Sequence, residues 1–140
     1  MLTNRSMPAC SVIPELAYRD VIQASDWLCA TFGFLPRLRI GTHRAQLSVG
    51  SGAVVLTEAT EADLLLLSIL ARPFAVMVRV DDVDRHFEGV TRSRASIVGE
   101  PTTYPYGERQ YSCRDLGGYV WIFSQTVADV APETWGGVPS

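Results

Sequence analysis

The chain contains no lysine: all 12 of its basic residues are arginine. Schiff-base catalysis, which needs a lysine amine, is therefore excluded. The arginines are scattered along the chain and the formal net charge is −3, so no basic stripe suggests a nucleic-acid partner. Neither GxGxxG nor GxxxxGK occurs, which removes the two common nucleotide-binding fingerprints.

Cysteines and long apolar runs are also scarce. The three cysteines, Cys10, Cys29 and Cys113, are widely spaced and form no CxxC pair, which indicates reduced thiols. The longest apolar stretch, residues 64–71 with only Ser68 interrupting it, is far too short to span a membrane. No basic-then-apolar leader opens the chain. We therefore expect a cytoplasmic protein without a membrane partner.

The sequence contains an internal repeat. Asp20-Val21 in the first half aligns with Asp82-Val83 in the second half, and each aspartate ends a strand-like segment and can cap the helix that follows. The spacing of apolar residues predicts helices over 21–32 and 84–93. Strands are expected over 36–41, 44–50, 53–58, 99–104, 109–114 and 119–125.

These elements give the order β-α-β-β-β twice within a single domain, residues 1–140. The first module covers about 12–59, a linker helix lies within about 60–72, and the second module covers about 74–125. The tail, 126–140, is rich in proline and glycine and is expected to be irregular.

The most informative stretch is YGERQYSCRDLGGYVWIFSQ, residues 106–125, which reads as a loop, a strand, a Gly-Gly turn and a second strand. With the Asp-ended strands and the helix exit Phe32-Gly33-Phe34, it resembles the glyoxalase/bleomycin-resistance/extradiol-dioxygenase proteins, the vicinal oxygen chelate superfamily. The loop 105–109 is similar to that of a branch likened to phosphonate-operon proteins. The resemblance implies an α+β fold of two tandem βαβββ modules, with curved mixed sheets around a cavity, and a homodimer.

The same resemblance implies that this chain lacks the superfamily's metal. The metalloenzymes carry histidine, glutamine or glutamate ligands on four strands, and the matching positions here are Ile13, Leu56, Ala75 and Ile122. None of these side chains can donate an electron pair to a cation. The two histidines, His43 in a turn and His86 on the second helix, are expected at the surface. We therefore expect neither a metal nor another cofactor.

Strand alternation predicts which side chains line the cavity. One face of the strands, with Leu16, Tyr18, Val76, Val78, Tyr119, Trp121 and Phe123, is expected beneath the helices. The opposite face includes the predicted cavity wall, which consists of Ile13, Glu15, Val54, Leu56, Ala75, Met77, Arg79, Ser112, Arg114, Val120 and Ile122. Alternation also places Gln110 and Ser124 on this side.

A loop beside this wall contributes Tyr104, Tyr106 and Arg109. Tyrosine rings and a guanidinium can stack on a planar ligand or hold an anion. The alternative is a loop that packs on its own hairpin or on a second subunit.

The leading hypothesis is a metal-free protein that binds a small molecule, similar to the bleomycin-resistance members. The alternative is an enzyme of the superfamily, a lyase, isomerase or dioxygenase, that uses Glu15 as general base or an unrecognised metal site. Glu15 has a second interpretation, as an ion-pair partner of Arg79 or Arg114 or as a residue at the cavity mouth. A module that binds a partner protein is the third hypothesis.

Overall fold

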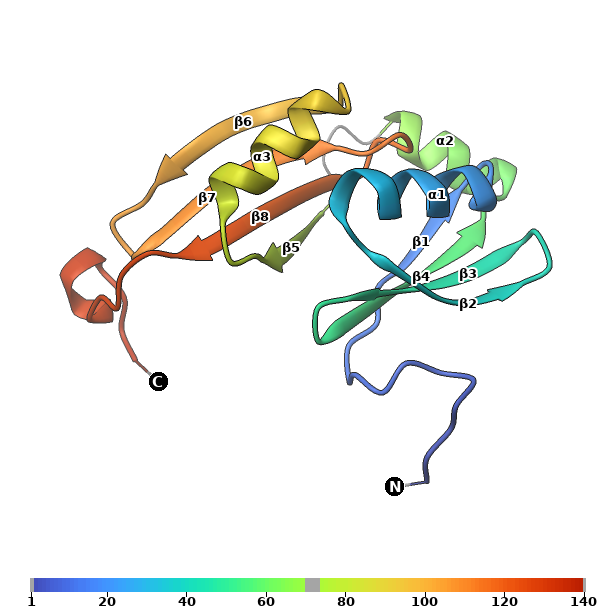
Figure 1. The fold of residues 1–140 in the computed structure, drawn as a ribbon, viewed down its shortest axis with the longest axis horizontal. Coiled ribbons are helices and arrows are strands. Elements are labelled where there is room, and N and C mark those ends of the chain that lie inside the picture. The colour runs from blue at the N-terminus through green and yellow to red at the C-terminus, as the bar shows by residue number, and fades with distance from the viewer. Residues whose placement is uncertain (1, 70–73, 140) are drawn as a thin grey trace. The chain divides into compact units, whose positions relative to one another are not determined.

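The computed structural model describes residues 2–69 and 74–139. The chain divides into two compact units, each built around one four-stranded mixed sheet (Figure 1). The first unit comprises residues up to 73 together with the short turn 116–118, and the second comprises 74–115 and 119–140. Both units have the expected order β-α-β-β-β, so the predicted α+β fold of two βαβββ modules is confirmed.

The first sheet has the strand order β1-β4-β3-β2, in which β1 runs parallel to β4 and the other pairs are antiparallel. The elements of this unit are β1 (Glu15–Tyr18), α1 (Val21–Phe32), β2 (Leu35–Ile40), β3 (Arg44–Val49), β4 (Gly52–Glu58) and α2 (Glu61–Ile69). The end of the expected linker helix, beyond residue 69, lies outside the described residues.

Helix α1 begins and ends where the sequence predicts. The Asp20 carboxylate accepts a 3.0 Å hydrogen bond from the backbone N–H of Gln23, and Gly33 ends the helix in the left-handed conformation, with φ of 81°. The helix packs on all four strands of its sheet and buries an apolar stripe against them. The stripe consists of Val21, Ala24, Leu28 and Phe32.

The second sheet has the order β5-β8-β7-β6, with β5 parallel to β8. Its elements are β5 (Ala75–Arg79), α3 (Val83–Arg92), β6 (Ser96–Thr103), β7 (Glu108–Arg114) and β8 (Val120–Thr126). The tail is irregular except for one 3-10 turn, Pro132–Trp135.

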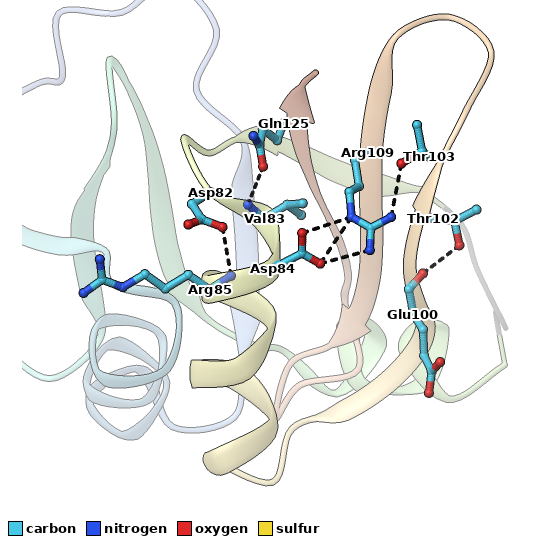
Figure 2. Close-up of polar contacts among 9 residues, drawn as sticks. All are labelled: Asp82, Val83, Asp84, Arg85, Glu100, Thr102, Thr103, Arg109 and Gln125. Atoms are coloured by element: carbon cyan, nitrogen blue, oxygen red, sulfur yellow. Dashed lines mark hydrogen bonds and ion pairs between the residues drawn. The ribbon is translucent and has the colours of Figure 1, made fainter. Parts of the chain in front are cut away.

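Two side chains accept hydrogen bonds from the start of α3, and one of them belongs to the sheet beneath it (Figure 2). Asp82 accepts a 3.0 Å hydrogen bond from the backbone N–H of Arg85, and Gln125 of β8 accepts one of 2.9 Å from the backbone N–H of Val83. Under the helix, Tyr111, Trp121 and Phe123 are almost fully buried. The faces predicted for β7 and β8 therefore agree with the structure.

The predicted surface position of His86 is wrong. Its ring is half-buried, lies 4.2 Å from the ring of Phe123, centroid to centroid, and its Nδ1 is hydrogen-bonded to the Tyr111 hydroxyl. The reason is helical spacing: His86 is three residues after Val83 and four before Val90, both fully buried, so it shares their inward face. His43 is exposed in the β2–β3 turn, as expected.

The face predicted for Val54 and Leu56 is also wrong. Leu56 is paired with Leu16 across β1 and β4, both side chains are fully buried, and residues in register on neighbouring strands point to the same side. Val54 and Leu56 therefore lie beneath α1, and Val55 and Thr57 take the opposite face. The physical cause is that Ala53–Leu56 is buried on both faces, which removes the alternation of polar and apolar residues.

Candidate functional site

The side of the second sheet away from α3, its distal face, carries half of the predicted ligand-binding residues. Pairing between strands arranges them in rows: Met77, Ile122 and Ser112 form the middle row. The rows on either side consist of Ala75, Val120 and Arg114, and of Arg79, Ser124 and Gln110. The structure thus brings together five predicted residues on one face: Met77, Arg79, Ser112, Arg114 and Ile122.

The middle of the distal face is apolar. Met77, on the edge strand β5, keeps 59% of its surface exposed, although methionine side chains are usually buried. Ile122, its neighbour on β8, is half-buried. An exposed methionine is a flexible, polarisable surface that adapts to apolar ligands of different shape.

One end of the distal face holds a chain of hydrogen bonds. Gln110 donates from Nε2 to Ser124 Oγ at 3.0 Å, and Ser124 donates in turn to Glu108 Oε1 at 2.8 Å. Tyr106 extends the chain, because its hydroxyl donates to Gln110 Oε1 at 3.4 Å. These groups are fixed by one another, so the face presents oriented donors and acceptors beside its apolar middle.

Glu108 is the charged member of this chain. A hydrogen bond from the Thr126 hydroxyl lowers the pKa of Glu108, burial opposes this effect, and the Ser124 hydroxyl and the Arg79 charge add to the lowering. Arg79 Nη1 lies 3.7 Å from Glu108 Oε1 and donates a hydrogen bond to Thr126. The carboxylate is therefore ionised at neutral pH and paired with a guanidinium that remains largely exposed.

The loop that carries Tyr104 and Tyr106, called the tyrosine loop below, forms an aromatic cluster with the tail. Tyr104 and Tyr106 stack with ring centroids 5.4 Å apart and planes 3° from parallel, and Trp135 contacts Tyr106 at 5.2 Å. A shallow hollow of about 580 Å³ lies beside this cluster, lined by Pro105, Tyr106, Thr134, Trp135 and Gly136. The contribution of Trp135 was not predicted, because nothing in the tail sequence shows that it folds back onto this loop.

Gly107 fixes the tail against the loop. Its φ is +84°, and its carbonyl accepts a 2.9 Å hydrogen bond from the backbone N–H of Val127. A Cβ at this position would lie 2.3 Å from the backbone oxygen of Ala128, so only glycine fits.

Arg109 lies on the other side of the sheet. Its guanidinium makes three hydrogen bonds of 3.0–3.2 Å to the Asp84 carboxylate of α3 and one of 3.1 Å to the Thr103 hydroxyl (Figure 2). The bond with Asp84 raises the pKa of Arg109. The side chain thus joins α3 to the β6–β7 hairpin and is not part of the distal face.

In the first unit, Glu15 is paired with Arg44. Its Oε2 lies 3.3 Å from Arg44 Nη2, and the Glu15 side chain is 60% exposed. The sequence offered an ion pair with Arg79 or Arg114 as one interpretation, and the structure instead gives Glu15 a partner on β3. Leu56 is buried under α1, so it does not lie on an exposed face of the first sheet.

The donor atoms present do not match a metal centre of the superfamily type. Among residues 2–69 and 74–139, no three histidine, cysteine, aspartate or glutamate side chains gather closely enough to hold a metal ion. Ala75 and Ile122, on the distal face, offer no donor atom. In the same described ranges, no helix is long and apolar enough to cross a membrane.

The predicted site does not include Glu108, Ser124 and Thr126, which lie beside its members. Alternation predicts the face of Ser124 but not its hydrogen bonds to Gln110 and Glu108. The same alternation, continued to the ends of β7 and β8, also places Glu108 and Thr126 on this face.

Two βαβββ modules, each with one helix on a four-stranded mixed sheet, define a class of fold that the comparisons identify. The model of the Glyoxalase/Bleomycin resistance protein/Dioxygenase superfamily matches residues 12–123, and the chain belongs to this superfamily. No curated protein matches the sequence.

Solved structures of the same fold include TioX from Micromonospora sp. ML1. TioX shares 34% identity over 87% of this chain and 100% of its own, with a TM-score of 0.68. A glyoxalase/bleomycin resistance protein/dioxygenase family enzyme from Burkholderia phytofirmans PsJN has 18% identity, coverage of 81% and 96%, and a TM-score of 0.67. The fosfomycin resistance protein FosX from Listeria monocytogenes has 11% identity, coverage of 85% and 94%, and a TM-score of 0.66. The last two likenesses concern the fold alone.

Proposed function

We propose that this protein binds a small organic molecule, without a metal ion, on the distal face of its second sheet. The observation that carries the proposal is the position of an exposed methionine, Met77, next to the fixed chain Gln110–Ser124–Glu108. Ligand sites typically combine an apolar surface with a few oriented polar groups.

The composition of the face indicates the chemistry of the ligand. An apolar body fits on Met77 and Ile122, and the exposed Arg79 guanidinium next to Glu108 suits a polar substituent at one end. The tyrosine loop supplies aromatic surface beyond the polar end. The similarity of this loop to phosphonate-operon proteins stays a prediction.

The absence of donor atoms at Ala75 and Ile122 supports binding without a metal, since three protein ligands are normally needed. The enzymatic alternative required a desolvated Glu15, and its ion pair with Arg44 at the surface does not favour that role. The binding hypothesis therefore leads.

We further propose that the protein is a homodimer. Helix α2 supports this proposal, because Leu65, Leu66 and Ile69 are each more than half exposed and clustered apolar residues of this kind are typical of subunit contacts. Light scattering after size exclusion tests it: Leu66→Glu is expected to yield monomers if α2 lies in the contact, whereas a monomeric parent protein contradicts the proposal.

The central experiment combines metal analysis with a ligand screen. Mass spectrometry of the purified protein measures bound metal, and thermal shifts with an organic compound library identify ligands through stabilisation of the folded state. Each hit is then measured on Met77→Glu and on the control Leu35→Glu, which places the same charge on an exposed apolar position of the first sheet.

We expect less than about a tenth of a metal equivalent and hits whose affinity falls at least about tenfold in Met77→Glu alone, since a buried carboxylate is costly. Hits that bind both variants equally well would place the site elsewhere. Stoichiometric metal, or turnover of a bound compound, would instead identify an enzyme.

A further inference from the structure

Part of the distal face of the first sheet, its side away from α1, is occupied by the beginning of the chain. Residues 4–7 form a turn in which Asn4 Oδ1 accepts a 3.0 Å hydrogen bond from Ser6 N–H and the Asn4 carbonyl accepts one of 3.2 Å from Met7 N–H. Asparagine at the first position of a turn stabilises it in this way. The next residue, Pro8, is buried.

Two side chains of the sheet bind the carbonyl groups of this turn. Arg37 on β2 donates from Nη2 to the carbonyls of Arg5 and Met7, at 3.0 and 2.9 Å. Gln46 on β3 donates from Nε2 to the carbonyl between them, that of Ser6, at 2.9 Å. Three successive backbone carbonyls are thus bound by two side chains that lie 30 to 40 residues away in sequence.

The two side chains are also bonded to each other, because Arg37 Nη1 donates to Gln46 Oε1. The Gln46 side chain is only 3% exposed, and its register with Val55 and Glu15 places it on the distal face. A buried amide N–H that loses its acceptor costs the free energy of its desolvation. In this structure the carbonyl oxygens of the turn satisfy the donors of the pair.

We propose that Arg37 and Gln46 form a binding site for a peptide turn, with residues 4–7 of the same chain as its occupant. The occupant is recognised by its backbone: in all three contacts the accepting atom is a main-chain oxygen. This segment covers the part of the distal face of the first sheet that surrounds Arg37 and Gln46. The proposal stands independently of the ligand proposed above.

Limited trypsin digestion of the full chain tests the site, since trypsin cuts after Arg5, inside the bound turn. Cleavage of a bound segment follows the population of its released form when release is fast. The rate of loss of residues 1–5 is measured by mass spectrometry, with cleavage after the exposed Arg94 as internal reference. The variants are Arg37→Gln, which removes the guanidinium, and Asn4→Ala, which loosens the turn without changing the sheet.

We expect both variants to accelerate cleavage after Arg5 by at least about tenfold, the effect of losing one charge-assisted hydrogen bond or more. The matched control is Arg39→Gln on the same strand, whose partner is Asp26 and not the turn, and it should leave the rate unchanged. Equal rates in the parent, Arg37→Gln and Asn4→Ala proteins would overturn the proposal. An unchanged rate after Arg94 shows that a variant is folded.

Discussion

The indole Nε1 of Trp121 donates a 2.9 Å hydrogen bond to the carboxylate of Asp115 inside the second unit. The other carboxylate oxygen accepts a 3.0 Å bond from the backbone N–H of Tyr119, so Asp115 ties the end of β7 to the start of β8. All three residues are buried. A buried carboxylate stays in place only when such donors surround it.

Asp115→Ala is therefore expected to lower the free energy of unfolding by about 3 kcal/mol, because the indole and amide N–H groups lose a charged acceptor. Urea denaturation measures the change. The exposed Asp129→Ala serves as control and should stay within about 0.5 kcal/mol of the parent. If Asp115→Ala lowers the free energy of unfolding no more than Asp129→Ala does, the two hydrogen bonds add little to stability.

The lowered pKa of Glu108 makes stability depend on pH. Its pKa in the folded state lies below the ordinary 4.5, so its ionised form adds stability above that pH and this stability is lost as the pH falls through the lower, folded-state pKa. The difference in melting temperature between the parent and Glu108→Gln should shrink from about pH 6 to about pH 3. The exposed Glu100→Gln is the control, and a difference that does not vary with pH would contradict the assignment.

The Cys113 thiol should be inert in the folded protein. It is fully buried, and burial, with the Asp115 charge adding to it, raises its pKa to about 12. Because the thiolate is the reactive form, a thiol reagent at about pH 8 should modify no more than Cys10 and Cys29, which are half-buried, until urea is added. In the Cys113→Ala variant, the number of thiols that react in the folded protein should be unchanged, and one fewer thiol should react after urea is added. Reaction of Cys113 at the rate of the other two would show that the β7 strand opens.

The middle row of the distal face can be tested by building a metal site. Met77, Ile122 and Ser112 lie side by side on three adjacent strands, so Met77→His, Ile122→Glu and Ser112→His together should hold Zn²⁺. Calorimetry should detect binding by the triple variant and none by the three single variants. If the triple variant also fails, the three side chains do not converge as the pairing implies.

The fold could be predicted from the sequence because local signals agreed with one another. Asp20 and Asp82 cap helices that start after strands, and apolar spacing marks the inward face of each helix. The signal failed on β4, where Val54 and Val55 are both buried and alternation vanishes. The prediction also failed at His86. Its polar side chain suggested a surface position, whereas its helical spacing from Val83 and Val90 predicts an inward one.

Only part of the candidate site could be predicted, because its residues are connected by hydrogen bonds between separate strands and helices. Met77, Ser112 and Ile122 follow from alternation, but the partner of Arg109 is Asp84, 25 residues earlier, and local sequence carries no sign of it. The same holds for the N-terminal turn, whose contacts with Arg37 are long-range hydrogen bonds without a hydrophobic pattern. Such pairs become visible only once the sheet register is known.

The backbone contact at Gly107 determines how the C-terminal tail packs on the tyrosine loop. A single methyl group there would push Ala128 away, and the tail that carries Trp135 would lose its anchor on the loop. The aromatic surface around Tyr106 thus depends on the absence of a Cβ atom at Gly107. A substitution at position 107 would therefore change the aromatic surface beside the proposed site without replacing any of the aromatic residues that form it.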